Sequence, residues 1–198
     1  MEIFDKYIKV IKGYVEKKEK IVIRIYGHGA SGKSTFCKIL VEQLDNNDIN
    51  LLETDPYIIS SEHRNLAIPK QFPNQKITAN MPLSHELNSL KRDILALKNG
   101  LDILTIEEPW SKSKILKAAK PILIVEGMSS AFLSKDLFDL SICLKTDPET
   151  EFKRRTIRDT RERNQDIEFI KNTQKSRREQ YQKFYERFEN DANIMIET

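Results

Sequence analysis

The chain has 198 residues, 39% of them hydrophobic and 32% charged, a composition typical of one globular domain with a sizeable core. Its formal net charge of +3 suits an anionic ligand but is too small to indicate a nucleic-acid partner. The longest wholly apolar run spans only Ile122 to Val125, so we expect no membrane-spanning segment and no membrane partner. The beginning of the chain is unlike a signal peptide, and Cys37 and Cys143 lack the spacing of metal ligands. We therefore expect a cytoplasmic protein with two buried, reduced thiols; whether it forms a homo-oligomer stays open.

The first third of the chain predicts a helix, a buried strand and a phosphate-binding loop. Residues 3–15 place apolar side chains at helical spacing, and we expect residues 1–19 to form a helix that covers a sheet. Residues 21–26 are rich in β-branched side chains and predict a strand, and residues 35–44 again have helical spacing. Between them lies the pattern G-x-x-x-x-G-K-S, made of Gly27, His28, Gly29, Ala30, Ser31, Gly32, Lys33 and Ser34, with Thr35 next.

Strand, glycine-rich loop and helix are the context that a P-loop requires. Glycines allow successive backbone N–H groups to face phosphate oxygens, and the start of the following helix adds partial positive charge. In such a loop Lys33 reaches the β- and γ-phosphates, and the Ser34 hydroxyl binds Mg²⁺. The sequence therefore predicts that the protein binds a nucleoside triphosphate.

A second predicted strand, residues 49–53, leads to Asp55 and Pro56. Ligands of open α/β sheets bind outside the carboxyl ends of the strands, so Asp55 is expected beside a phosphoryl acceptor. Pro56 disfavours helical geometry at the residue before it, which predicts an extended turn at Asp55. Taken alone, Asp55 fits equally well as a turn or helix-capping aspartate.

The middle of the chain is less informative. Residues 56–81 are polar and predict a mobile loop on the substrate side. Residues 82–99 predict a helix that begins near Pro82 and stops at Gly100. Residues 101–106 predict a short strand, and residues 112–120 are basic and are expected to be helical in part.

Two later segments carry charges that suit phosphate chemistry. The apolar run 122–125 ends in Glu126, whose carboxylate would lie beside the P-loop and could hold a metal ion or its water. A strand over 139–145 leads into a helix with five arginines: Arg154, Arg155, Arg158, Arg161 and Arg163. These arginines either clamp phosphates or form i,i+4 pairs on a solvated helix, and the residues alone leave both open. We expect a long helix over 166–190, with Phe169, Tyr181, Phe184, Tyr185 and Phe188 as its buried side, and a closing strand at 192–196.

In order and spacing these landmarks resemble the uridine kinase and phosphoribulokinase group of P-loop kinases, from about residue 20 to 196. The segment Asp55-Pro56-Tyr57 is similar to the D-x-Y of that family, and residues 124–127 resemble its I-L-E-G. The most specific similarity is residues 154–163, which resemble the family's R-R-x-x-R-D-x-x-E-R lid segment. Residues 192–196 resemble its closing A-D-I-I-V strand.

This resemblance implies a single kinase domain over residues 1–198. Its expected fold is an α/β three-layer P-loop sandwich, with a mostly parallel five-stranded sheet flanked by helices and an arginine-rich lid over 151–170. The implied reaction transfers the γ-phosphoryl group of ATP to a hydroxyl of a small acceptor. Asp55 would be the base, Ser34 and Glu126 would hold Mg²⁺, and Arg154 would contact the nucleotide. Three further arginines would close over the phosphates: Arg155, Arg158 and Arg163.

The acceptor side departs from the family pattern. Uridine kinases carry Tyr, His and Arg after the strand that corresponds to 101–106, whereas this chain has Glu107-Glu108-Pro109-Trp110. We expect Trp110 to stack on a ring and Tyr57 to lie at the acceptor. Glu107 or Glu108 is expected either to accept hydrogen bonds from sugar hydroxyls or to pair with a cationic acceptor. A nucleoside such as uridine or cytidine is the expected acceptor, with a different small acceptor, or nucleotide binding without transfer, as alternatives. A GTPase-like switch is disfavoured because no N-K-x-D segment occurs.

Overall fold

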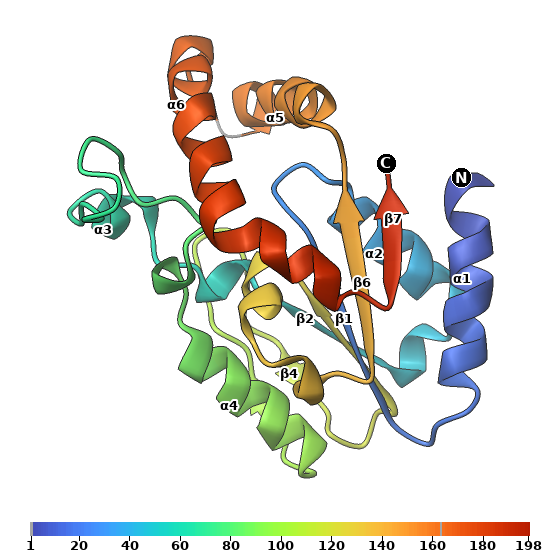
Figure 1. The fold of residues 1–198 in the computed structure, drawn as a ribbon. Coiled ribbons are helices and arrows are strands. Elements are labelled where there is room, and N and C mark those ends of the chain that lie inside the picture. Colours follow the sequence, from blue (N-terminus) through green and yellow to red (C-terminus); the bar gives the residue numbers. More distant parts are fainter. Residues whose placement is uncertain (1, 163) are drawn as a thin grey trace.

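In the computed structural model, which describes residues 2–162 and 164–198, a five-stranded sheet forms the centre of the molecule (Figure 1). Its strands are β1 (Ile21–Tyr26), β2 (Ile49–Glu53), β5 (Ile122–Glu126), β6 (Leu140–Lys145) and β7 (Ile194–Glu197). They lie in the order β2-β5-β1-β6-β7, and all four pairings are parallel. This confirms the predicted α/β class and the predicted strands at 21–26 and 49–53.

Helices cover both faces of the sheet. On one face α1 (Glu2–Val15) and α2 (Lys33–Gln43) pack Phe4, Ile8 and Phe36 against the odd-numbered residues of β1. On the other face lies α4 (Leu87–Lys98), whose Leu90 and Ile94 pack with Val22. Because β1 is buried on both faces, its sequence is apolar almost throughout, as expected of a central parallel strand. Arg24 is the exception, and Ser141 and two backbone carbonyl groups accept its hydrogen bonds.

Two further helices follow β6 at the upper edge of the sheet in Figure 1: α5 (Pro148–Glu162) and α6 (Ile167–Gln180). The predicted helix over 166–190 is α-helical only to Gln180; a π-helical turn (Tyr181–Tyr185) and a 3₁₀ segment (Glu186–Asp191) continue it. Phe169 was predicted to be buried but is 46% exposed, because it lies on the outer side of α6. Tyr181 and Tyr185 are buried as expected.

Of three predictions for the middle of the chain, two were right only in part and one was wrong. The helix expected from Pro82 begins at Leu87, because Pro82–Ser84 forms a 3₁₀ turn and His85 is extended and forms a β-bridge with Ile58. In the segment 101–106 only β3 (Ile103–Leu104) is a strand, and it pairs with β4 (Ile115–Leu116) outside the main sheet. The expected helix within 112–120 is therefore the second half of a hairpin, fixed to β2 by hydrogen bonds between Asn50 and Lys117.

The segment from Asp55 to Met81 contains little regular structure. Asp55–Tyr57 is a 3₁₀ turn and not the extended turn predicted from Pro56; a proline is tolerated in the first turn of a helix because its missing N–H would be unpaired there. The short helix α3 (Ser61–Arg64) follows, capped by the Ser60 hydroxyl. None of the helices in the described part of the chain has the length and hydropathy needed to cross a membrane.

Candidate active site

The P-loop connects β1 to α2 in the predicted way, and its backbone geometry explains its glycines. Gly27 and Gly32 have φ angles of +146° and +86°, values that favour glycine. A Cβ atom on Gly27 would lie 2.0 Å from the Leu144 carbonyl oxygen. Helix α2 begins at Lys33, so the N–H groups of its first turn have no partner within the helix and are available to an anion.

Lys33 lies at the centre of the site and contacts the loop itself. Its Nζ donates a hydrogen bond of 2.8 Å to the His28 carbonyl oxygen. Burial lowers the pKa of Lys33, and the negative charges of Glu126 and Asp55 oppose that shift. The three side chains are therefore close enough to interact electrostatically. Lys33 therefore helps to neutralise the negative charge of Glu126 and Asp55.

His28 holds the loop in place as a neutral imidazole. Its Nδ1 lies 2.9 Å from the Gly29 carbonyl oxygen, and its Nε2 lies 3.1 Å from the Thr146 backbone nitrogen. Since the Thr146 N–H can only donate, Nε2 accepts and Nδ1 carries the proton. Burial lowers the pKa of His28, with Glu151 opposing, which agrees with this assignment. His28 thereby ties the P-loop to the segment that leads into α5.

The sheet register brings the two predicted carboxylates together. Glu53 of β2 is the pairing partner of Glu126 of β5, and the Thr54 N–H donates to the Glu126 carbonyl oxygen at 2.8 Å. Asp55 follows directly, at the same carboxyl edge of the sheet. The Ser34 hydroxyl donates to Glu126 Oε1 at 3.4 Å, and burial raises the pKa of Glu126.

Serine hydroxyl and carboxylate oxygens are ligands that Mg²⁺ accepts, and Mg²⁺ in kinases is held by few protein groups together with substrate phosphates. The pair Ser34 and Glu126 fits that pattern. Lys33 and the open N–H groups of α2 fit the phosphates themselves. The donor set therefore suits magnesium and a nucleotide as sequence analysis expected.

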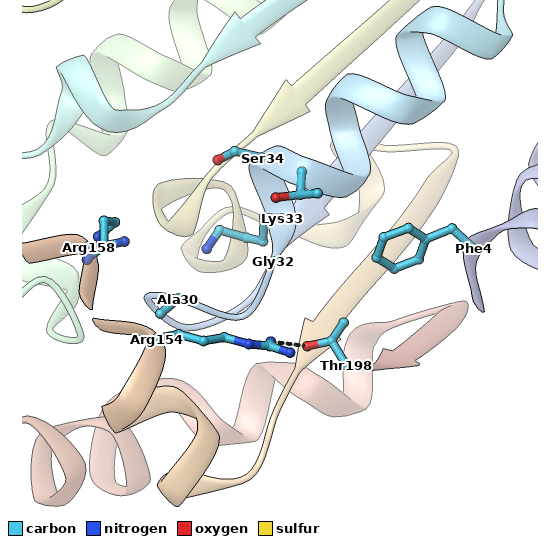
Figure 2. Close-up of a pocket in the computed structure, with 9 residues that line it drawn as sticks. Phe4, Ala30, Gly32, Lys33, Ser34, Arg154, Arg158 and Thr198 are labelled. Atoms are coloured by element: carbon cyan, nitrogen blue, oxygen red, sulfur yellow. Dashed lines mark hydrogen bonds between the residues drawn. The ribbon is translucent and has the colours of Figure 1, made fainter. Parts of the chain in front are cut away.

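A cavity of about 400 Å³ opens beside this centre. Figure 2 shows that Lys33 and Ser34 lie at one part of it, while Phe4 and Thr198 approach from elsewhere. The Arg154 guanidinium extends along it and donates to Thr198 Oγ1 at 2.8 Å. Ala30, Gly32, Thr35 and Arg158 complete the lining. Phe4 and Thr198 were missed by sequence reasoning, because nothing in their local sequence shows that α1 and the end of β7 converge on the loop.

The predicted arginine clamp is only partly at the cavity. Arg154 and Arg158 line it, and Arg158 Nη2 lies 2.8 Å from Asp159 Oδ1. Arg155 does not: its side chain is 3% exposed and bridges α5 to α6, paired with Glu151 at 3.6 Å and hydrogen-bonded to Gln174. Arg163 lies outside the described residues.

The residues predicted for the acceptor lie apart from the cavity lining. Tyr57 is buried, and its hydroxyl donates to Asp93 Oδ2 at 2.6 Å, which joins the Asp55 turn to α4. Trp110 is 65% exposed in the turn between β3 and β4, and Glu107 accepts from Ser113 within the same hairpin. The hairpin nevertheless reaches the site, since Lys114 Nζ lies 3.1 Å from Glu53 Oε2.

A P-loop after the central strand β1, with acidic residues at the ends of the adjacent strands β5 and β2, defines the fold of a P-loop kinase. A family model described as the Phosphoribulokinase / Uridine kinase family matches residues 22–198. The chain therefore belongs to that family.

Individual relatives agree at low identity. A uridine kinase from Staphylococcus epidermidis is 26% identical over 185 residues, which cover 88% of this chain and 86% of that protein. A chloroplastic phosphoribulokinase from Arabidopsis thaliana is 27% identical over 201 residues, covering 91% of this chain and 50% of that protein. Among solved structures, a possible uridine kinase from Bacillus stearothermophilus superimposes with a TM-score of 0.63 at 15% identity, over 98% of this chain and 97% of that chain. The last similarity concerns the fold alone.

Proposed function

We propose that the protein transfers the γ-phosphoryl group of ATP to a hydroxyl group of a small acceptor. The observation that carries this proposal is the convergence of Lys33, Asp55 and Glu126 at one edge of the sheet, directly beside the P-loop. Phosphoryl transfer asks a protein mainly for positioning and for neutralisation of charge, and these groups supply both. Nucleosides are the first acceptor class to test, since several relatives carry the name uridine kinase.

Each residue has a role that follows from its position. Asp55 accepts the proton of the acceptor hydroxyl. The oxygen of that hydroxyl forms a bond to the γ-phosphorus of ATP, while the bond between the γ-phosphorus and the departing ADP oxygen breaks. Lys33 and Arg158 neutralise the charge that develops on the transferred group. Ser34 and Glu126 would hold Mg²⁺, which supplies further charge neutralisation when bound. Phe4, Arg154 and Thr198 are at the part of the cavity that would receive the remainder of the nucleotide.

The decisive test is acceptor-dependent formation of ADP in the presence of Mg²⁺. The panel contains uridine, cytidine, other nucleosides, pantothenate, ribulose 5-phosphate and simple sugars, and each reaction is corrected for ATP hydrolysis without acceptor. A kinase gives a phosphorylated product in stoichiometric amount with ADP, and Asp55→Asn lowers kcat for that product. Binding of ATP with no transfer to any acceptor would instead favour a nucleotide-binding protein without transfer activity.

A further inference from the structure

Arg64 and Arg177, which no sequence motif singled out and which do not line the P-loop cavity, lie near Arg158 of the predicted clamp. Arg64 is the last residue of α3, Arg177 belongs to α6, and Arg158 belongs to α5. Three separate elements therefore each contribute a guanidinium. Arg158 faces the P-loop cavity, whereas Arg64 and Arg177 are not part of its lining.

Backbone contacts bring Arg64 close to the base. Its Nε donates to the Ile59 carbonyl oxygen at 2.8 Å, and its Nη1 lies 3.3 Å from the Ile77 carbonyl oxygen. Ile59 is one residue beyond Ile58, whose N–H donates to the Asp55 carbonyl oxygen at 3.0 Å. His85 is the β-bridge partner of Ile58, and burial lowers the pKa of its imidazole. The positive charge of Arg64 lowers that pKa further, whereas the negative charge of Asp55 raises it. Arg64 therefore lies near His85 and the turn that carries Asp55.

Residues 77–80, which contact Arg64 through the Ile77 carbonyl oxygen, also contact the backbone of Arg177 in α6. The Asn80 side chain donates to the Arg177 carbonyl oxygen at 2.9 Å, and the Gln180 side chain accepts from the Thr78 N–H at 2.9 Å. Residues 77–80 thus contact Arg64 on one side and α6 on the other. Figure 1 shows the chain that follows α3 running past α6.

Among the described residues neither arginine forms an ion pair, and Asp159 is a carboxylate that acts on Arg177 electrostatically. Within residues 2–162 and 164–198, no hydrogen bond is made by the Arg177 guanidinium. Both side chains are half-buried. Burial lowers the pKa of Arg177 to about 10; the charges of Arg155, Arg64 and Arg158 add to the effect, and only Asp159 opposes it. Guanidinium groups gathered in a partly desolvated place repel one another unless an anion joins them.

We propose that Arg64 and Arg177, with Arg158 beside them, form a subsite for an anionic group of the acceptor, a phosphate or a carboxylate. This inference rests on the proposed function, because it is Asp55 that marks where the acceptor hydroxyl lies. The preferred acceptor then carries both a hydroxyl and an anion, and a neutral nucleoside is a poorer substrate than its phosphorylated counterpart. The planar guanidinium is suited to bidentate recognition of either group.

A binding experiment tests the subsite independently of turnover. Inorganic phosphate is titrated calorimetrically into the protein saturated with Mg²⁺ and a non-hydrolysable ATP analogue, which occupies the γ-phosphate position. We expect phosphate to bind, and Arg177→Gln or Arg64→Gln to weaken binding at least tenfold, whereas Arg177→Lys weakens it less. The matched control is Lys171→Gln, an exposed charge on the same helix, which should change affinity less than twofold.

Arg177→Gln is the more direct test, because no hydrogen bond of the Arg177 guanidinium is found among the described residues, whereas Arg64→Gln also loses hydrogen bonds to the Ile59 and Ile77 carbonyl oxygens. Urea unfolding of each variant separates a loss of stability from a loss of binding. Absence of phosphate binding in the analogue complex, or binding that both glutamine variants leave unchanged, would overturn the proposal.

Turnover with matched acceptors identifies the anion. The pairs are uridine and uridine 3′-monophosphate, ribose and ribose 5-phosphate, and glycerol with glycerate and glycerol 3-phosphate. We expect the anionic member to have the lower KM, with Arg177→Gln raising that KM at least tenfold and leaving the KM for ATP unchanged. A lower KM for glycerol 3-phosphate than for glycerate would identify the anionic group of the acceptor as a phosphate, and the reverse order would identify it as a carboxylate.

A loss of kcat that is equal for neutral and anionic acceptors would place Arg177 on the transferred phosphoryl group and refute the subsite. If no acceptor is phosphorylated while phosphate still binds through Arg64 and Arg177, the proposed function fails and the subsite stands.

Discussion

Substitution of Gly127 by alanine should separate the two strand ends that carry the acidic residues. Gly127 follows Glu126 and has φ +134° and ψ 176°, a backbone conformation essentially restricted to glycine. A Cβ atom there would lie 2.1 Å from Thr54 Oγ1, and Thr54 is fully buried immediately before Asp55. The backbone strain costs about 1–3 kcal/mol and overpacking costs about 1–3 kcal/mol more. We therefore expect Gly127→Ala to lower the free energy of unfolding by about 2–6 kcal/mol.

The assay is urea unfolding of the wild type and the variant, compared at equal m-value, together with kcat at a temperature where both are folded. Gly13→Ala is the control, because a Cβ on Gly13 meets nothing within 4 Å and alanine in helix α1 should stabilise by about 0.5–1 kcal/mol. Thr54→Ala removes the clashing oxygen, so the double variant should recover part of the loss. A Gly127→Ala cost below about 1 kcal/mol, or no coupling to Thr54→Ala, would refute this reasoning.

Three other substitutions test the site. Asp55→Asn should lower kcat about 100-fold or more while the KM for ATP stays constant, and undiminished turnover would exclude Asp55 as the base. Burial lowers the pKa of His85 to about 4, so between about pH 4 and 6.5 the unfolded chain binds more protons than the folded protein. The free energy of unfolding therefore decreases as the pH falls through that range, by at most about 3 kcal/mol. Urea unfolding against pH should show a flatter profile for His85→Gln, and identical slopes would contradict this. Trp110→Ala should raise the acceptor KM several-fold if the ring stacks on the acceptor, whereas an unchanged KM would remove the stacking hypothesis.

The local pattern predicted the P-loop half of the site because each signal is contained in a few neighbouring residues. The β-branched run at 21–26, the glycines at 27 and 32, and the helix that begins at Lys33 specify one another over short distances. Glu126 was identifiable for the same reason, as an acidic residue that ends a wholly apolar strand. Parallel strands place such ends at one edge of the sheet, so the approach of Asp55 to Glu126 followed from topology.

The acceptor half could not be predicted in this way, because its residues are brought together by contacts between distant segments. The helix expected at Pro82 starts later because His85 pairs with Ile58 and packs against Ser129. The 112–120 segment pairs with β3 and β2 although its composition suits a helix, a case in which tertiary contacts outweigh local propensity.

Some of the arginines at the site could be identified from the sequence, whereas others could be identified only from the packing of the helices. The sequence shows a cluster of arginines in and just after α5, and resemblance to a lid segment suggested phosphate contacts for Arg155, Arg158 and Arg163. Helical pitch turns Arg155 to a different side from Arg154 and Arg158, but which side is buried depends on the packing of α6 against α5. Arg155 is buried between Glu151 and Gln174, while Arg154 and Arg158 line the cavity. Arg64 and Arg177 carry no motif at all, and they become a candidate subsite only because residues 77–80 join α3 to α6. The groups expected to contact the nucleotide could be read from the sequence, because most of them lie in one contiguous loop. The identity of the groups facing the acceptor depended on how three separate elements pack.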